Sequence, residues 1–439
     1  MQTVDVGKVL DDGNWGAYQK ILIALTALAI VFDGIDNQLL GVAVPAIMAE
    51  WNVPRAAFAP VISIGYAGMM IGGAAAGLAG DRFGRRSVLL ISMVLFGVTT
   101  GLSALATTPM QIAWLRLLAS AGLGGAIPNA AVLAAEFVPK RIRPIAVTLT
   151  IVCVPVGGMI AGLLGVRLLP VLGWRNLFIL GGVLPLLWAA VLWRALPESP
   201  RYLVRRPNRW SELASTLTRM GHATPRDVSF VDATEAKVEA GSIGALFERQ
   251  LRRDTFALFI AFFACMLAVY LGFGWLTSLL TSGGFDPATA NIGIVYFNLG
   301  GVVGALVGSM IIGRYGSRMP MLLMAAGAAA SAFVLSTMTI DAGRVVPIMA
   351  MLTVNGGLIN AVQVTLYALA AHVYPSGIRA SGVGTASVIG RIGAIVSGFA
   401  GAWAIDYGGS SSYFTLIAAS MIAALIAVSF VSRHVERPR

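Results

Sequence analysis

The chain has 439 residues, of which 57% are hydrophobic and only 12% are charged, and its formal net charge is +11. Soluble globular chains are about 25% charged, so this composition leaves too little polar surface for a water-soluble body and excludes a soluble enzyme. The positive charges fall in short segments between apolar runs and are not interleaved with stacking aromatics, which excludes a nucleic-acid-binding groove. The lipid bilayer is therefore the expected solvent, and we predict an all-α polytopic membrane protein.

Twelve apolar runs bounded by glycine, proline or charge are long enough to span a bilayer, because a spanning helix needs about 20 apolar residues. In chain order they cover 19–48, 56–79, 87–106, 109–136, 144–168, 174–194, 254–282, 288–312, 319–338, 344–372, 379–405 and 412–431. The first 18 residues hold Asp5, Asp11 and Asp12 and lack the basic start and small-residue cleavage site of a signal peptide. The first run is therefore predicted to be an uncleaved helix.

One long polar segment divides the twelve runs into two sets of six. We predict an N-terminal six-helix bundle over 1–194, a cytoplasmic linker with one or two surface helices over 195–253, and a C-terminal six-helix bundle over 254–439. With the N-terminus in the cytoplasm, the outer connections hold few basic residues: Arg55, Arg167, Arg175 and Arg344. The positive-inside rule then places both termini in the cytoplasm.

The two halves carry an internal repeat. Residues 135–143, at the end of the fourth run, align at an offset of 236 with residues 371–379, at the end of the tenth. Residues 77–86, between the second and third runs, align at an offset of 232 with residues 309–318. Parallel repeats of this kind build transporters in which two bundles rock about a site at the bilayer midplane.

Several of these segments resemble a known superfamily. Residues 77–86, Arg116 with Gly122 and Gly124, and the sequence PESPRYL at 197–203 resemble loop and helix signatures of the major facilitator superfamily. More narrowly, the sequence FDGID at 32–36 and the segments 374–375, 379–384 and 390–395 are similar to the aromatic acid:proton symporter family. The resemblance implies a bacterial inner-membrane symporter with two pseudo-symmetric six-helix bundles, which imports aromatic carboxylates such as hydroxybenzoates by alternating access.

Two carboxylates lie midway along the first predicted helix. Asp33 and Asp36 are three residues apart and therefore share one face of the helix. Intramembrane carboxylates are energetically expensive and normally face a cavity or a partner. Burial favours the neutral form of a carboxyl group, which is what a reversible proton carrier requires. The alternative is a permanently ionised aspartate that pairs with Arg116 and holds two helices together.

Two arginines also fall inside predicted helices. Arg391 lies near the middle of the eleventh run, where its planar guanidinium can bind a substrate carboxylate through two hydrogen bonds. A structural ion pair with Asp33 or Asp36 is the other interpretation of Arg391. Arg116, in the fourth run, lies at a depth comparable with Asp36, so it is a candidate for proton coupling or for a static ion pair.

Further polar residues at helix ends are candidate gating groups. Asp81 lies at the turn between the second and third helices, where it can oppose the positive N-terminal end of the eleventh helix near Arg379. The resemblance implies that this contact closes the cytoplasmic side, with Arg82 and Arg85 near anionic lipid headgroups. Glu136 and His372 are equivalent in the repeat and lie near the cytoplasmic ends of helices four and ten, as gating groups or surface hydrogen-bonding groups.

Aromatic and amide side chains are weaker candidates for substrate contact. Tyr270 and Trp275 can stack on an aromatic ring, and Asn129, Asn298 and Gln363 can bind a hydroxyl group. Taken singly, each of them favours packing between helices or a place in the interfacial belt over substrate contact.

The sequence lacks nucleotide-binding motifs and clusters with metal-ligand spacing, so we expect no cofactor, no metal and no ATP-driven pump. The expected partners are protons, a small organic anion and the lipid bilayer, and the chain is expected to be a monomer. Three alternatives to aromatic acid symport remain: proton-coupled efflux of drugs or metabolites, symport of a non-aromatic acid, and a non-transporting sensor on the same scaffold.

Overall fold

The structure is a computed structural model that describes residues 2–222, 228–232, 243–375 and 377–436. Within these residues it contains ten helices that are long and apolar enough to cross a membrane. They are α2 (Ala17–Trp51), α3 (Ala59–Phe83), α4 (Arg85–Ser103), α5 (Pro109–Glu136), α6 (Arg143–Ala195), α9 (Arg252–Ser282), α10 (Pro287–Tyr315), α11 (Arg318–Thr337), α12 (Val345–Val373) and α13 (Arg379–Phe430).

The helix α6 consists of two membrane spans. A straight helix of its 53 residues would measure about 80 Å, more than twice the thickness of the hydrocarbon core. The chain turns at Gly173, which has a positive φ of 73° that a glycine adopts without strain. Beyond the turn, Trp174 donates a hydrogen bond to Glu50 (2.7 Å), and Trp188 donates one to the Leu25 carbonyl (3.2 Å). The second arm of α6 therefore runs antiparallel to α2.

The helix α13 folds back in the same way. Its non-helical residues are Gly408 and Gly409, and Gly409 has a φ of 60°. After this turn, Tyr413 donates to the Leu271 carbonyl of α9 (2.7 Å), and the Ser432 amide donates to Asp254 at the start of α9 (2.7 Å). With α6 and α13 each counted as two spans, the described chain crosses the membrane twelve times, which confirms the predicted fold class.

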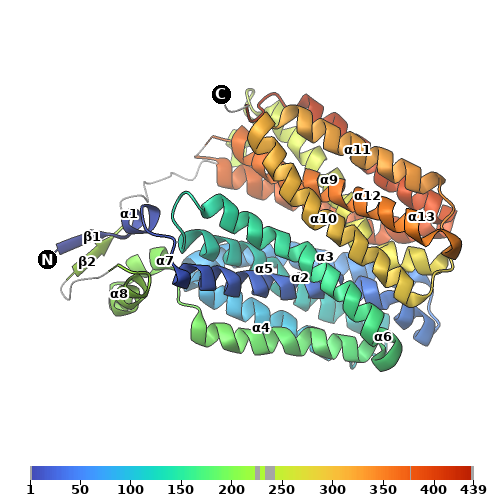
Figure 1. The fold of residues 1–439 in the computed structure, drawn as a ribbon, viewed down its shortest axis with the longest axis horizontal. Helices are drawn as coiled ribbons and strands as arrows, with labels where there is room; N and C mark the ends of the chain where they lie inside the picture. Colours follow the sequence, from blue (N-terminus) through green and yellow to red (C-terminus); the bar gives the residue numbers. More distant parts are fainter. Residues whose placement is uncertain (1, 223–227, 233–242, 376, 437–439) are drawn as a thin grey trace.

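The packing of the helices repeats between the two halves. In the first half α2 packs on α6, α3 on α5 and α4 on α5, and in the second half α9 packs on α13, α10 on α12 and α11 on α12. Figure 1 shows the two resulting bundles side by side, the first in blue to green and the second in yellow to red. Both chain ends lie at the same end of the bundles, which we call the termini end; the opposite end is the far end.

The termini end carries short elements outside the bundles. They are β1 (Gln2–Asp5), α1 (Val6–Asp11), α7 (Pro200–Val204), α8 (Trp210–Arg219) and β2 (Val228–Val231), with 3₁₀ turns at Pro207–Arg209 and Ile243–Phe247. Two more 3₁₀ turns, Arg55–Ala57 and Ala342–Arg344, lie in the loops of the far end. The sequence predicted the surface helices of the linker but not the parallel pairing of β1 with β2, because four-residue strands give too little alternation to detect.

The bundles are joined midway along the helices and at the far end. Arg55, before α3, forms an ion pair with Asp406 of α13 and donates a hydrogen bond to Ser278 of α9 (3.2 Å). Nearer the middle, the Ser63 hydroxyl donates to the Ile395 carbonyl (2.8 Å). These contacts close the far end in this conformation.

Glycines set the close approach of α2 and α6, the helices that position the central carboxylates. A Cβ added at Gly157 would lie 2.2 Å from the Val31 carbonyl oxygen and 2.7 Å from the Gly34 Cα. Both contacts are with backbone, which cannot move aside as a flexible side chain can. Any side chain at position 157 therefore forces the two helices apart.

We expect Gly157→Ala to destabilise the protein by about 1–3 kcal/mol, the usual penalty for overpacking. Thermal unfolding of the purified protein in detergent measures the effect. The matched control is Gly313→Ala, because a Cβ at Gly313 meets nothing within 4 Å. Equal unfolding temperatures for the two variants would contradict the close-packing argument.

Candidate functional site

The first transmembrane helix, α2, carries both intramembrane carboxylates into the protein interior. Asp33 and Asp36 are fully buried, with 0% of either residue exposed. Burial of an ionised carboxylate is tolerated only with compensating partners, so the surroundings of each decide what it can do.

Asp36 is fully partnered. Its carboxylate forms an ion pair with Arg116 of α5 (3.0 Å) and accepts a hydrogen bond from the Thr100 hydroxyl of α4 (2.5 Å). A second nitrogen of Arg116 donates to the Asp36 backbone carbonyl (3.1 Å). Such charge-assisted contacts favour the ionised carboxylate, so Asp36 and Arg116 form a neutral pair that joins α2, α4 and α5.

Asp33 has a different environment. Neither of its carboxyl oxygens has a hydrogen-bond partner among the described residues. The ion pair with Arg391 that the sequence offered as one interpretation is not formed in this conformation, because Arg391 bonds to the Tyr270 hydroxyl instead. An unpartnered buried carboxyl group is best accommodated as the neutral acid, so Asp33 is suited to take up and release a proton.

Arg391 of α13 lies among aromatic rings. Its guanidinium donates to the Tyr270 hydroxyl (2.6 Å), contacts the Met69 sulfur and lies 5.8 Å from the centroid of the Tyr270 ring. The Tyr270 ring packs edge-on against Tyr66 of α3, with 4.5 Å between ring centroids, and against Phe273 at 5.6 Å. A cation beside aromatic rings, with no carboxylate bonded to it, is an arrangement suited to an aromatic carboxylate.

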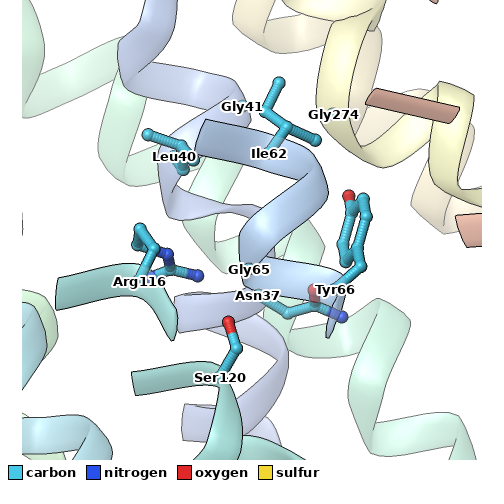
Figure 2. Close-up of a pocket in the computed structure, with 9 residues that line it drawn as sticks. All are labelled: Asn37, Leu40, Gly41, Ile62, Gly65, Tyr66, Arg116, Ser120 and Gly274. Atoms are coloured by element: carbon cyan, nitrogen blue, oxygen red, sulfur yellow. The ribbon is translucent and has the colours of Figure 1, made fainter. Parts of the chain in front are cut away.

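A small cavity lies between this aromatic cluster and the ion pair. It holds about 10 Å³ and is lined by Asn37, Leu40, Gly41, Ile62, Gly65, Tyr66, Arg116, Ser120 and Gly274. Figure 2 shows Arg116 and Ser120 on one side of the cavity and Asn37 and Tyr66 on the other, with the Tyr66 ring directed toward Gly274 of α9. The cavity has room for about one water molecule.

Four other predicted substrate residues bond to protein groups in this conformation. Asn298 exchanges two hydrogen bonds with Gln38 across the bundles (2.7 and 3.0 Å), and Trp275 donates to the Gly398 carbonyl (3.0 Å). Asn129 donates to two backbone carbonyls of α3 and α5, and Gln363 donates to the Met266 sulfur. Their contact with substrate stays a prediction.

The predicted gating residues lie at the termini end. Asp81 forms an ion pair with Arg85 of its own bundle, and Arg85 also contacts Asn129 at 3.5 Å. Arg379 bonds to the Tyr374 carbonyl within the second bundle (3.4 Å). The contact of Asp81 with the α13 N-terminus therefore stays a prediction for another conformation.

The other three gating candidates are Glu136, Arg82 and His372. The carboxylate of Glu136 accepts a hydrogen bond from the Ser199 hydroxyl. The guanidinium of Arg82 lies over the Phe83 ring at 5.4 Å, and His372 is exposed. A gating role for these three residues also stays a prediction.

Sequence reasoning missed several residues of this region. Thr100 bonds to Asp36 and Met69 contacts Arg391. Tyr66 packs on Tyr270, and it lines the cavity together with Asn37 and Ser120. The available signal was spacing: Asn37 is four residues from Asp33, and Ser120 is four residues from Arg116, so each lies one helical turn from a predicted charge. Glu198 of the PESPRYL segment was also missed; it is fully buried and accepts a hydrogen bond from the Arg86 amide at the start of α4 (2.9 Å).

A comparison with sequence families gives a match to the Major Facilitator Superfamily. The match covers residues 26–360 and 258–439 of this chain. Two solved structures share the fold: a D-xylose-proton symporter (TM-score 0.73, 19% identity, 95% of this chain and 99% of that one) and the inward-open xylose transporter XylE from E. coli (TM-score 0.74, 20% identity, 94% and 97%). The fold and the buried charges thus define a multi-pass membrane transporter, not an enzyme.

Similar proteins that are named as transporters of particular compounds narrow the class of transporter to which this chain belongs. The gallate transporter of Pseudomonas putida is 33% identical over 97% of this chain and 94% of its own length. The 4-hydroxybenzoate transporter PcaK of Acinetobacter baylyi is 31% identical over 97% and 94%, and the benzoate transport protein of that organism is 28% identical over 92% and 87%. The chain therefore belongs to the aromatic acid:proton symporter family of the major facilitator superfamily.

We expect Arg116→Met to destabilise the protein by about 3–5 kcal/mol, because it leaves the buried Asp36 carboxylate uncompensated. The double variant Asp36→Asn with Arg116→Met removes both charges and should recover much of that loss. Thermal unfolding in detergent compares the two. If the double variant unfolds at the same temperature as the single one, the ion pair is not what stabilises this region.

Proposed function

We propose that this protein imports aromatic monocarboxylates across the bacterial inner membrane in symport with protons. The observation that carries the proposal is the pairing of an unbonded buried carboxyl group, Asp33, with a guanidinium set among aromatic rings, Arg391. The similarity to gallate, 4-hydroxybenzoate and benzoate transporters supports the same substrate class.

The coupling follows from competition for Arg391. While Asp33 is ionised, its charge already partly balances the guanidinium, and a substrate carboxylate would meet like-charge repulsion from Asp33. Once Asp33 is protonated, that repulsion disappears and the substrate becomes the counter-charge of Arg391. The substrate therefore binds together with a proton. Asp36 and Arg116 act in this scheme as the fixed pair that holds α2 against α4 and α5 next to Asp33.

The proposed arrangement in the membrane follows from the charge distribution. Both termini lie in the cytoplasm, the bundles are 1–194 and 254–439, and 195–253 forms the cytoplasmic linker. The monomer is the proposed unit of transport, because each chain carries both bundles. Since the far end is closed by Arg55 and Asp406, the described conformation would have its outer side shut.

Asp33→Asn should abolish uphill uptake driven by a pH gradient while retaining exchange of labelled for unlabelled substrate, because the amide mimics the protonated acid but cannot release a proton. Proteoliposomes loaded with substrate measure both activities. The control is Glu212→Gln, which removes an acidic group of α8 that pairs with Arg209 outside the bundles. Full uphill uptake by the Asp33 variant would disprove its proton-carrying role.

Arg391→Lys should weaken the affinity for benzoates about tenfold despite keeping the charge, because an ammonium cannot form the paired hydrogen bonds of the guanidinium. Binding to the purified protein is measured with benzoates, hydroxybenzoates, phenylpropanoids, phthalates and non-aromatic acids. Preferential binding of non-aromatic acids would contradict the proposed substrate class. Unchanged benzoate affinity in the variant would remove Arg391 from the site.

A further inference from the structure

Three polar side chains that line the central cavity have no hydrogen-bond partner in the described part of the chain: Asn37 of α2, Tyr66 of α3 and Ser120 of α5. They are 7%, 6% and 2% exposed. Their polar atoms are not among the fully enclosed, unbonded side-chain atoms of the described residues, so they are accessible from the cavity. An amide or hydroxyl group in such a position bonds to whatever occupies the cavity. Three such groups around one cavity indicate that a further polar group belongs there.

The chemistry of the cavity selects a neutral group. An amide and two hydroxyls can each donate and accept hydrogen bonds, which suits a hydroxyl group. Arg116 is the charged residue of the lining, and its charge is already balanced by Asp36. A second carboxylate would therefore find no free positive charge, whereas a hydroxyl group fits the volume of about 10 Å³.

The cavity also lies at a suitable position relative to Arg391. Arg391 bonds to the Tyr270 hydroxyl, and the Tyr270 ring packs on the ring of Tyr66, which lines the cavity. The guanidinium and the cavity are thus separated by aromatic side chains rather than adjacent. An aromatic acid bound to Arg391 by its carboxylate reaches the cavity with the opposite edge of its ring only if its ring takes the place of the contact between Tyr270 and Tyr66.

We propose that Asn37, Tyr66 and Ser120 form a subsite for a ring hydroxyl group on the side of the substrate opposite its carboxylate. The proposal rests on the proposed function, because it takes Arg391 as the carboxylate anchor. It makes the protein a transporter that selects hydroxylated over unsubstituted aromatic acids. A site built to bond a hydroxyl group discriminates against ligands that lack it, because its polar groups are then left unpaired.

The test is binding of four ligands to the purified full-length protein: benzoate, 2-hydroxybenzoate, 4-hydroxybenzoate and terephthalate. We expect 4-hydroxybenzoate to bind roughly tenfold more tightly than benzoate, as for one well-made hydrogen bond. The hydroxyl of 2-hydroxybenzoate lies beside the carboxylate and should give no such gain. Terephthalate, with a carboxylate in place of the hydroxyl, should bind more weakly than benzoate.

The variants Asn37→Leu, Tyr66→Phe and Ser120→Ala should each reduce the ratio of 4-hydroxybenzoate to benzoate affinity, and Ser120→Thr should retain it by keeping the hydroxyl. The matched control is Ser309→Ala, whose hydroxyl bonds to its own helix at Ala305; it should keep the wild-type ratio. Equal losses for both ligands would indicate a structural role and overturn the proposal.

Two further outcomes separate this subsite from the proposed function. If wild type binds benzoate and 4-hydroxybenzoate equally, the cavity holds a bound water only, and the subsite is disproved while aromatic acid binding stands. If no aromatic carboxylate binds, the proposed function fails and the subsite with it.

Discussion

The cost of charge inside a membrane shapes the centre of this protein. Asp33, Asp36, Arg116 and Arg391 lie in membrane-spanning helices where water cannot solvate them, so each must be balanced by another group. Asp36 and Arg116 are balanced by one another and by Thr100. That pair draws together three helices of the first bundle. Asp33 is left without a bonded partner, and Arg391 bonds to Tyr270 rather than to a carboxylate, which is the basis of the proposed roles in proton and anion binding.

The glycines of the helices make this arrangement possible. Because α2 approaches α6 closely at Gly34 and Gly157, the helix that carries both aspartates is fixed by backbone contact rather than by adaptable side chains. The second bundle meets α2 similarly, since a Cβ at Gly41 would lie 2.3 Å from the Phe273 carbonyl oxygen. Rigid bundles with a closely fitted interface favour movement as whole bodies, which is the motion that alternating access requires.

The fold and the charged centre could be read from the sequence because lipid makes the signals strong. Apolar runs of about 20 residues identify the spans, and charges inside them, such as Asp33 and Arg391, stand out as exceptions. The same reasoning places the turn of α6 at Gly173, as a gap between two runs. Two features escaped it, and the first is the pair β1 and β2, whose strands are too short to give a pattern. The side chains of Tyr66, Asn37 and Ser120 are ordinary in composition, and only three-dimensional packing shows that they share one cavity.

The same packing separates two roles that the sequence left combined. Asp33 and Asp36 share a helix face and a motif, so residue spacing cannot say which one carries a proton and which one is structural. Their environments differ: Asp36 lies toward α4 and α5, where Thr100 and Arg116 satisfy it, while Asp33 lies one turn closer to the termini end without a bonded partner. These contacts support the proposed division, in which Asp36 keeps a fixed charge beside Arg116 and Asp33 carries the proton. Under that proposal the ion pair persists while Asp33 changes its charge, so the bundle would keep its packing through each protonation step.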